Sequence, residues 1–290
     1  MLPAAATHHI PILHAIVLGV TQGLSEFLPV SSSGHLILVP WLFRWHELTG
    51  PANAHLNKTF DVALHMGTFV GAVAYFRADL VRLLAAGLTS IRDRAVRTVD
   101  ERLAWLLLLS AVPGAIAGAA LESTIEDNLG QPWLIATMLI VFGIVLLVAD
   151  RLPQTLDVDD FNVREAVTMG IAQAVALQPG VSRSGITITA GRVLGLDRDA
   201  AARISFLMSL PIIFGAGMKK ALDVLRDGVP HGVAGAFAWG TVASAVTGFA
   251  AVWLVLRAVR TRSFAPFVAY RVVAGLFVLS IIVAGVRPAS

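Results

Sequence analysis

The chain has 290 residues, of which 56% are hydrophobic and only 14% are charged, and its mean hydropathy is +0.76. A soluble domain typically carries about 25% charged residues, so this composition excludes a soluble enzyme and a disordered chain. The formal net charge is only +3, with 22 basic against 19 acidic residues, which excludes a nucleic-acid binder. No cysteine is present, so disulfides and thiol chemistry are excluded as well. The composition predicts an integral membrane protein.

The apolar segments that lie between the charged residues predict an all-α protein with a single membrane domain over residues 1–290. A membrane-spanning helix needs about 20 mostly apolar residues. Six segments are long enough to be spans: 60–76, 103–121, 132–149, 203–218, 236–256 and 266–286. Two further apolar segments, 12–40 and 165–195, are interrupted by Pro, Gly and Ser. The basic stretch 77–102 and the acidic stretch 150–160 are interpreted as polar loops.

The two interrupted segments resemble each other. With a shift of 151 residues and no gap, Gly19–Leu38 aligns with Gly170–Thr189, and seven of the 20 pairs are identical. Shared membrane composition could match Leu, Val and Ile, but it explains a matched Gln and an S-x-S-G string poorly. We therefore expect an internal repeat, with one half at about 10–150 and the other at about 161–290.

If each interrupted segment is a re-entrant helical hairpin, the three spans between them make the two hairpins enter from opposite faces. This is the inverted-repeat arrangement, in which sites form near the midplane from interrupted helices. Irregular backbone at that depth is tolerated where it is buried in protein or lines a wet cavity, so the interruptions are expected to mark a site.

With Arg183 and Arg271 left out, the basic residues divide fourteen against six between the two predicted sides. The richer side is predicted to be cytoplasmic by the positive-inside rule, and it collects Arg77, Arg82, Arg92, Arg94, Arg97, Arg102, Arg151, Arg164, Arg192, Arg198, Arg203, Arg257, Arg260 and Arg262. The other side collects Arg44, Lys58, Lys219, Lys220, Arg226 and Arg287. Both termini and the first interrupted segment are then extracytoplasmic.

Polar side chains inside an apolar segment are costly and usually functional. In the first interrupted segment they are Gln22, Glu26, Ser31, Ser32, Ser33 and His35. Gln22 and Glu26 are four residues apart and share a helix face, and Pro29 then stops that helix. A carboxylate, hydroxyls and an imidazole can supply acid–base and nucleophilic groups. The alternative is that Glu26 and His35 form a satisfied buried pair.

The second interrupted segment adds a positive charge, Arg183, in a turn with Ser182, Ser184 and Thr187. The apolar run that follows predicts a helix that begins just after Gly185. Helix N–H groups, hydroxyls and a guanidinium together suit a phosphate, although an arginine can also extend to a membrane interface.

Three polar residues elsewhere are secondary candidates. Asp61 and His65 are also four residues apart, and Arg271 lies inside the last span, where a buried carboxylate could pair with it. For each of them a structural role is as plausible as a functional one.

Two motifs carry a resemblance to a known family. They read Gln22-G-L-S-Glu26-F-L-P-V-S-S-S-G-His35 and Pro179-G-V-Ser182-Arg183-Ser184-G-I-Thr187. With these motifs, their order and the F-x-x-Y-R element at Arg271, the chain resembles the bacterial undecaprenyl-pyrophosphate phosphatase family linked to bacitracin resistance. Many members carry Glu where this chain has Gln22, which leaves Glu26 as the sole carboxylate of its motif.

The resemblance implies a multi-pass enzyme of the bacterial plasma membrane. Its active site would be extracytoplasmic, and it would hydrolyse undecaprenyl diphosphate to the monophosphate and phosphate. This recycles the lipid carrier for peptidoglycan synthesis and confers bacitracin resistance. The partners are then a polyprenyl diphosphate and the lipid bilayer, with no nucleic acid, and a homodimer is an open alternative to a monomer. A transporter or flippase for a phosphorylated lipid is the rival interpretation.

Roles follow for the motif residues. We expect Glu26, His35, Ser32 and Arg183 to be catalytic, with the nucleophile open between Ser32, His35 and water. The expected phosphate-binding residues are Ser182, Ser184, Thr187, Gln22, Ser31 and Ser33. A divalent cation, Mg²⁺ or Ca²⁺, is expected at Glu26 with Gln22 beside it, and no organic cofactor is expected.

Overall fold

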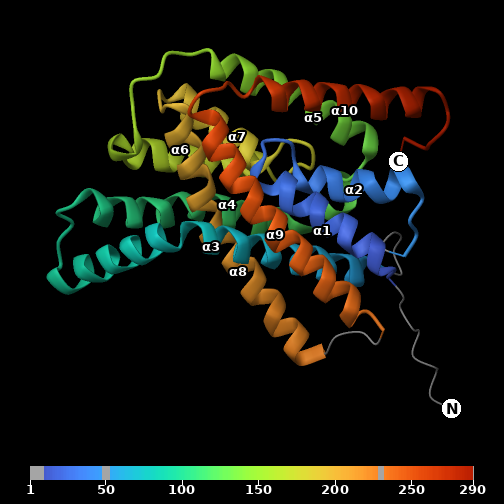
Figure 1. The fold of residues 1–290 in the computed structure, drawn as a ribbon, viewed down its shortest axis with the longest axis horizontal. Coiled ribbons are helices and arrows are strands. Elements are labelled where there is room, and N and C mark those ends of the chain that lie inside the picture. Colours follow the sequence, from blue (N-terminus) through green and yellow to red (C-terminus); the bar gives the residue numbers. More distant parts are fainter. Residues whose placement is uncertain (1–9, 48–52, 228–231, 290) are drawn as a thin grey trace.

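The computed structural model describes residues 10–47, 53–227 and 232–289. These residues form α-helices, one short 3₁₀ helix, Val158–Asp160, and no β-strand beyond a single bridge between Leu156 and Leu196. The helices are α1 Ile12–Phe27, α2 Ser32–Phe43, α3 Ala54–Asp93, α4 Val99–Asn128, α5 Pro132–Asp150, α6 Val163–Val175, α7 Arg183–Val193, α8 Arg198–Asp227, α9 Ala234–Val259 and α10 Ala265–Val283 (Figure 1). The all-α prediction is confirmed. The N-terminus, whose side of the membrane was predicted, lies outside the described residues.

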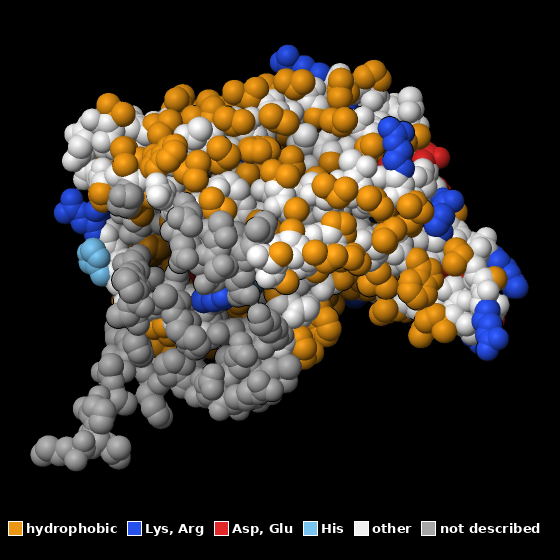
Figure 2. Space-filling model, turned by 180° about the vertical axis from the view of Figure 1, so that it is seen from behind, with side chains coloured by type: hydrophobic (Ala, Val, Ile, Leu, Met, Phe, Trp, Pro, Cys, Tyr) orange, Lys and Arg blue, Asp and Glu red, His pale blue; other side chains and the backbone are white. Residues whose placement is uncertain are grey.

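Five helices in the described part of the chain are long and apolar enough to cross a membrane. They are Val99–Ala120 of α4, α5, Arg198–Met218 of α8, α9 and α10. The sixth predicted span, 60–76, is helical but lies within the 40-residue helix α3, which is not among the five. Asp61 and His65 lie within that stretch, and Arg77 follows it directly. Hydrophobic side chains spread over the described part of the face seen in Figure 2, and most of its basic side chains lie near the margins.

The interpretation of 77–102 as a polar loop is wrong. Helix α3 continues to Asp93 and α4 begins at Val99, so most of this stretch is a helical hairpin. An ion pair joins the two helices, because Arg82 of α3 donates to Asp100 of α4 at 2.5 Å, and it also donates to Asp79 of its own helix at 3.0 Å. The sequence shows the charges of this region, but their pairing across the hairpin appears only in the fold.

Each interrupted segment is a helix, a turn and a second helix. Helix α1 ends at Phe27 and α2 starts at Ser32, while α6 ends at Val175 and α7 starts at Arg183. Helix α7 therefore begins two residues before Gly185 rather than after it. The residues that cap α2 and α7, Ser31 and Ser182, both have a φ of 77°, a left-handed value that is rare for residues other than glycine.

The side chains of these two serines explain why the chain turns there. Ser31 Oγ accepts from Gly34 N at 3.4 Å, and Ser182 Oγ accepts from Gly185 N at 3.1 Å. Each hydroxyl thus caps the helix that follows it, which satisfies a backbone N–H that has no partner within the helix.

Close helix crossings support the two hairpins from the outside. Helix α1 packs on α9, and α6 packs on α4. At the first crossing, a side chain at Gly19 would have its Cβ 2.3 Å from Gly240 O. At the second, a Cβ at Gly170 would be 2.6 Å from Ser110 O. Glycine is required at both positions because the neighbouring backbone leaves no room. Helices α5 and α10 pack together along the edge of the molecule (Figure 1).

Candidate active site

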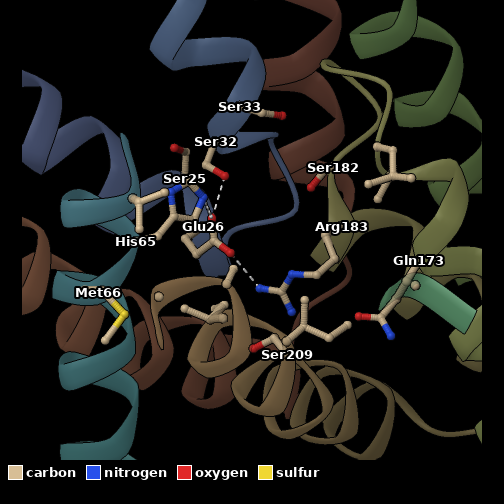
Figure 3. Close-up of a pocket in the computed structure, with 18 residues that line it drawn as sticks. Ser25, Glu26, Ser32, Ser33, His65, Met66, Gln173, Ser182, Arg183 and Ser209 are labelled. Atoms are coloured by element: carbon tan, nitrogen blue, oxygen red, sulfur yellow. Dashed lines mark hydrogen bonds and ion pairs between the residues drawn. The ribbon is translucent and has the colours of Figure 1, made fainter. Parts of the chain in front are cut away.

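The C-terminal end of α1 and the N-terminal end of α7 bring Glu26 and Arg183 together. Arg183 Nη2 donates to Glu26 Oε1 at 2.8 Å, although the two residues are 157 positions apart in the sequence (Figure 3). Arg183 Nη1 donates to Ser205 O of α8 at 3.1 Å. Glu26 is only 6% exposed, and the guanidinium offsets the charge of this buried carboxylate. The two motifs therefore form one site.

The second oxygen of Glu26 is contacted from its own hairpin. Ser32 Oγ donates to Glu26 Oε2 at 2.6 Å, and Gln22 Nε2 donates to the same oxygen at 3.0 Å. The carboxylate is thus held in one orientation by Arg183 on one side and by Ser32 and Gln22 on the other. A hydroxyl that donates to a fixed carboxylate is arranged for deprotonation, as nucleophilic catalysis requires.

Glu26, Ser32 and Arg183 line a cavity of about 310 Å³. The polar lining consists of Ser25, Glu26, Ser32, Ser33, His65, Gln173, Ser182, Arg183 and Ser209. The rest of the wall is apolar and comes from Val62, Met66, Gly114, Ala176, Leu177, Ile212, Ile213, Ala216 and Gly217. A cavity that combines an Arg–Glu pair with apolar walls suits an amphiphilic ligand that has an anionic head.

The remaining predicted phosphate-binding residues have different positions. Ser33 and Ser182 line the cavity with Ser32. Ser31 Oγ also accepts from Gly180 N at 3.0 Å, which joins the two turns. Two further hydroxyls are engaged inside the protein: Ser184 Oγ donates to Leu28 O at 3.1 Å, and Thr187 Oγ1 pairs with Ser205 Oγ at 2.6 Å.

His35 lies in a neighbouring cavity of about 470 Å³, beside Thr21, Ser25 and Tyr270. Its Nδ1 is 2.7 Å from Ser31 O, and its Nε2 is 2.8 Å from Tyr270 Oη. A carbonyl can only accept, so Nδ1 carries the proton and Nε2 accepts from the tyrosine. His35 therefore does not pair with Glu26 in this structure, and Ser25 is the residue that both cavities share.

Arg271 is completely buried and has no carboxylate partner among the described residues. It donates instead to backbone carbonyls on three elements. The acceptors are Leu139 O at 2.9 Å, Met138 O at 3.3 Å, Pro29 O at 3.1 Å, Gly180 O at 2.9 Å and Val181 O at 3.0 Å. The suggestion of a buried carboxylate partner is wrong, and the carbonyls of both turns take its place.

Other helices contribute residues that the motifs alone could not identify. His65 of α3 faces Glu26, with Nε2 3.6 Å from Oε2, and it was only a secondary candidate from the sequence. Gln173 and Ser209 line the cavity from α6 and α8. Gln173 aligns with Gln22 in the expected repeat, which was a usable signal, whereas nothing in the sequence around Ser209 marks it.

The residues present do not fit a cation held by Glu26 and Gln22. Both oxygens of Glu26 already accept from protein donors, and Gln22 turns its N–H group rather than its carbonyl oxygen toward Glu26. The described residues contain no group of three or more His, Cys, Asp or Glu side chains that could hold a metal ion.

Comparison with known proteins agrees with the two motifs. The family model described as bacitracin resistance protein BacA matches residues 15–277. The chain belongs to this family. A protein of Pelobacter propionicus named undecaprenyl-diphosphatase is 47% identical over 277 residues, which cover 95% of this chain and 98% of that protein. Proteins of the same name from Geobacter sulfurreducens and a Nocardioides species are 46% and 43% identical, covering 93% and 96% of this chain and 97% and 98% of those proteins.

Proposed function

We propose that this protein is a membrane phosphatase that hydrolyses undecaprenyl diphosphate to the monophosphate and inorganic phosphate. The observation that carries the proposal is the contact of Arg183, Glu26 and Ser32 in a cavity that also has apolar walls. A diphosphate head would lie beside Arg183, and the first part of the prenyl chain would lie along the apolar wall. The name shared by the relatives agrees with this chemistry.

Each side chain has a role in the proposed reaction. Arg183 binds the terminal phosphoryl group and offsets the charge that develops on its oxygens, which is the main requirement in phosphoryl transfer. Ser32 Oγ attacks phosphorus while Glu26 accepts its proton. Backbone N–H groups at the start of α7, together with Ser33 and Ser182, add donors to the phosphoryl oxygens.

His35 is a less direct participant in this scheme. It holds the turn through Ser31 O and Tyr270 Oη, and it acts on the site by keeping Ser31 and Ser32 in place. The choice of Ser32 over His35 as nucleophile rests on the 2.6 Å contact between Ser32 and Glu26.

A divalent cation, Mg²⁺ or Ca²⁺, would enter together with the diphosphate. Magnesium usually keeps several waters and binds substrate phosphates rather than a cage of protein ligands. Such an ion would offset substrate charge, while Arg183, Glu26 and Ser32 carry out the steps assigned to them.

The orientation that we propose places the active site and both termini on the extracytoplasmic side of the bacterial plasma membrane. The fourteen-to-six division of basic residues supports it.

An inverted repeat, with halves at about 10–150 and 161–290, is supported by the equal φ of Ser31 and Ser182 and by the packing of α1 on α9 and of α6 on α4. In this position the enzyme would recycle the lipid carrier for peptidoglycan synthesis and confer bacitracin resistance.

The test is phosphate release from undecaprenyl diphosphate by detergent-purified protein, with Glu26→Gln as the inactive comparison. We expect one phosphate and one undecaprenyl monophosphate per substrate consumed, and almost no turnover in the variant. The rival function, a transporter or flippase, predicts that the wild-type protein releases no phosphate. It would move labelled lipid diphosphate across proteoliposome membranes without releasing phosphate.

A further inference from the structure

A two-step hydrolysis through Ser32 requires a second proton acceptor. In the first step Glu26 takes the Ser32 proton as the Oγ–phosphorus bond forms. The bond from phosphorus to the bridging oxygen breaks, and the lipid monophosphate leaves with its electron pair. In the second step the phosphorus–Oγ bond breaks, and Ser32 needs that proton back from Glu26. Glu26 therefore cannot also accept the proton of the attacking water.

The lining of the cavity offers one other acceptor. Among the described residues around it, Glu26 and His65 are the only carboxylate and imidazole. Gln22 contacts the same Glu26 oxygen, but as a neutral amide it cannot take a proton at that position. The second base should therefore come from α3 rather than from either motif.

His65 is held in the tautomer that a base needs. Its Nδ1 is 2.8 Å from Asp61 O, one helical turn earlier, and a carbonyl can only accept, so Nδ1 carries the proton. The lone pair is then on Nε2, which faces Glu26 Oε2 at 3.6 Å, too far for a direct hydrogen bond. The side chain of His65 is 33% exposed and lines the cavity, so a water molecule can reach it.

The charges around His65 favour this role. Glu26 faces Nε2, and Arg183 sits on the other oxygen of Glu26. Asp61 is on the same helix, one turn away. Glu26 holds the Ser32 proton at the start of the second step, and it becomes a carboxylate that faces the imidazolium at Nε2 as it returns that proton to Ser32. Figure 3 shows His65 and Ser32 on the same side of Glu26, opposite Arg183.

We propose that His65 is the catalytic base of the second step, an inference that rests on the proposed function. Its Nε2 removes a proton from water while the water oxygen bonds to the phosphorus of phospho-Ser32. The phosphorus–Oγ bond breaks, Glu26 returns its proton to Ser32, and inorganic phosphate leaves. His65 then releases its proton to solvent, so one water is consumed for each phosphate formed.

The test is pre-steady-state kinetics of His65→Gln with substrate labelled in its terminal phosphate. We expect a first turnover close to that of the wild type, which releases one lipid monophosphate per enzyme. Steady-state turnover should then fall about 100-fold or more, as for other lost general bases, and acid-quenched protein should carry label on Ser32. His14→Gln is the matched control, because His14 pairs with Glu47 outside the cavity and should behave like the wild type.

Several outcomes would overturn the proposal. Unchanged steady-state turnover would exclude His65, and a first turnover slowed as much as the steady state, with no labelled Ser32, would place His65 elsewhere in the reaction. His65→Ala gives a second check, because added imidazole should restore its turnover and should not change that of Ser32→Ala. Failure of imidazole to restore activity in folded protein would also count against the proposal. Wild-type protein that releases no phosphate would instead refute the proposed function.

Discussion

At the scale of single residues, the site depends on how the carboxylate of Glu26 is divided between its partners. One oxygen faces Arg183, and the other faces Ser32 and Gln22. The guanidinium also bonds Ser205 O of α8, so it spans two acceptors with its two Nη atoms. The planar guanidinium of arginine can contact both acceptors at once, and the single ammonium of a lysine cannot.

Arg183→Lys should therefore lose most of the activity even though it keeps the charge. We expect kcat to fall by about 10²–10³-fold, the usual cost of removing a preorganised electrostatic contact. Arg164→Lys, an exposed position on α6, serves as the matched control in the same phosphate-release assay. Near-normal turnover of Arg183→Lys would show that charge alone is sufficient.

Two adjacent serines allow the nucleophile to be tested. Ser32 donates to Glu26, whereas Ser33 lines the same cavity without a hydrogen bond to that carboxylate. We expect Ser32→Ala to have no turnover above background and Ser33→Ala to keep a measurable part of it, with a weaker KM. If Ser32→Ala turned over at a rate comparable to Ser33→Ala, a direct attack by water would replace the serine mechanism.

At the scale of secondary-structure elements, the two turns are joined to each other directly and through Arg271. Arg271 of α10 donates to Pro29 O of one turn and to Gly180 O and Val181 O of the other. Ser31 Oγ of the first turn accepts from Gly180 N of the second. The relative position of Ser32 and Arg183 therefore depends on a side chain that lies outside the two turns.

Arg271→Lys should disturb stability and catalysis together. A lysine has three donors on one nitrogen and cannot reach all five carbonyls, and each buried carbonyl left unpaired costs about 1–3 kcal/mol. We expect a lower melting temperature in detergent and a kcat reduced more than tenfold, while Arg257→Lys on the exposed end of α9 should change neither. A variant with lowered stability but normal kcat would show that Arg271 does not position the turns.

At the scale of the whole molecule, the charge distribution makes a prediction about topology. The chain has no cysteine, so single cysteines can be introduced without a background. Val96, between α3 and α4, and Val286, near the C-terminus, are 55% and 59% exposed. These two valines form a matched pair for labelling from opposite sides.

Val286→Cys should react with a membrane-impermeant thiol reagent in intact cells, and Val96→Cys should react only after permeabilisation. This follows from the positive-inside rule applied to the basic hairpin of α3 and α4. The reverse pattern would place the C-terminus in the cytoplasm and contradict the proposed extracytoplasmic site.

The sequence by itself determined the class of protein, the main helices and the family. Composition alone requires a membrane protein, because so few charges cannot cover a soluble surface. Local patterns also located both interrupted segments, since Pro29 and the Ser–Gly turns disfavour a continuous helix. The resemblance read from the two motifs is confirmed by the family match over residues 15–277.

Only the tertiary structure decided which groups meet. Glu26 and Arg183 are 157 positions apart, and their contact depends on how two hairpins and α10 pack together. The approach of His65 from α3, the placement of His35 in a second cavity and the carbonyl partners of Arg271 arise in the same way. Local sequence sets backbone preference within a few residues. A hydrogen bond between distant segments depends instead on distances fixed by the packing of the whole bundle.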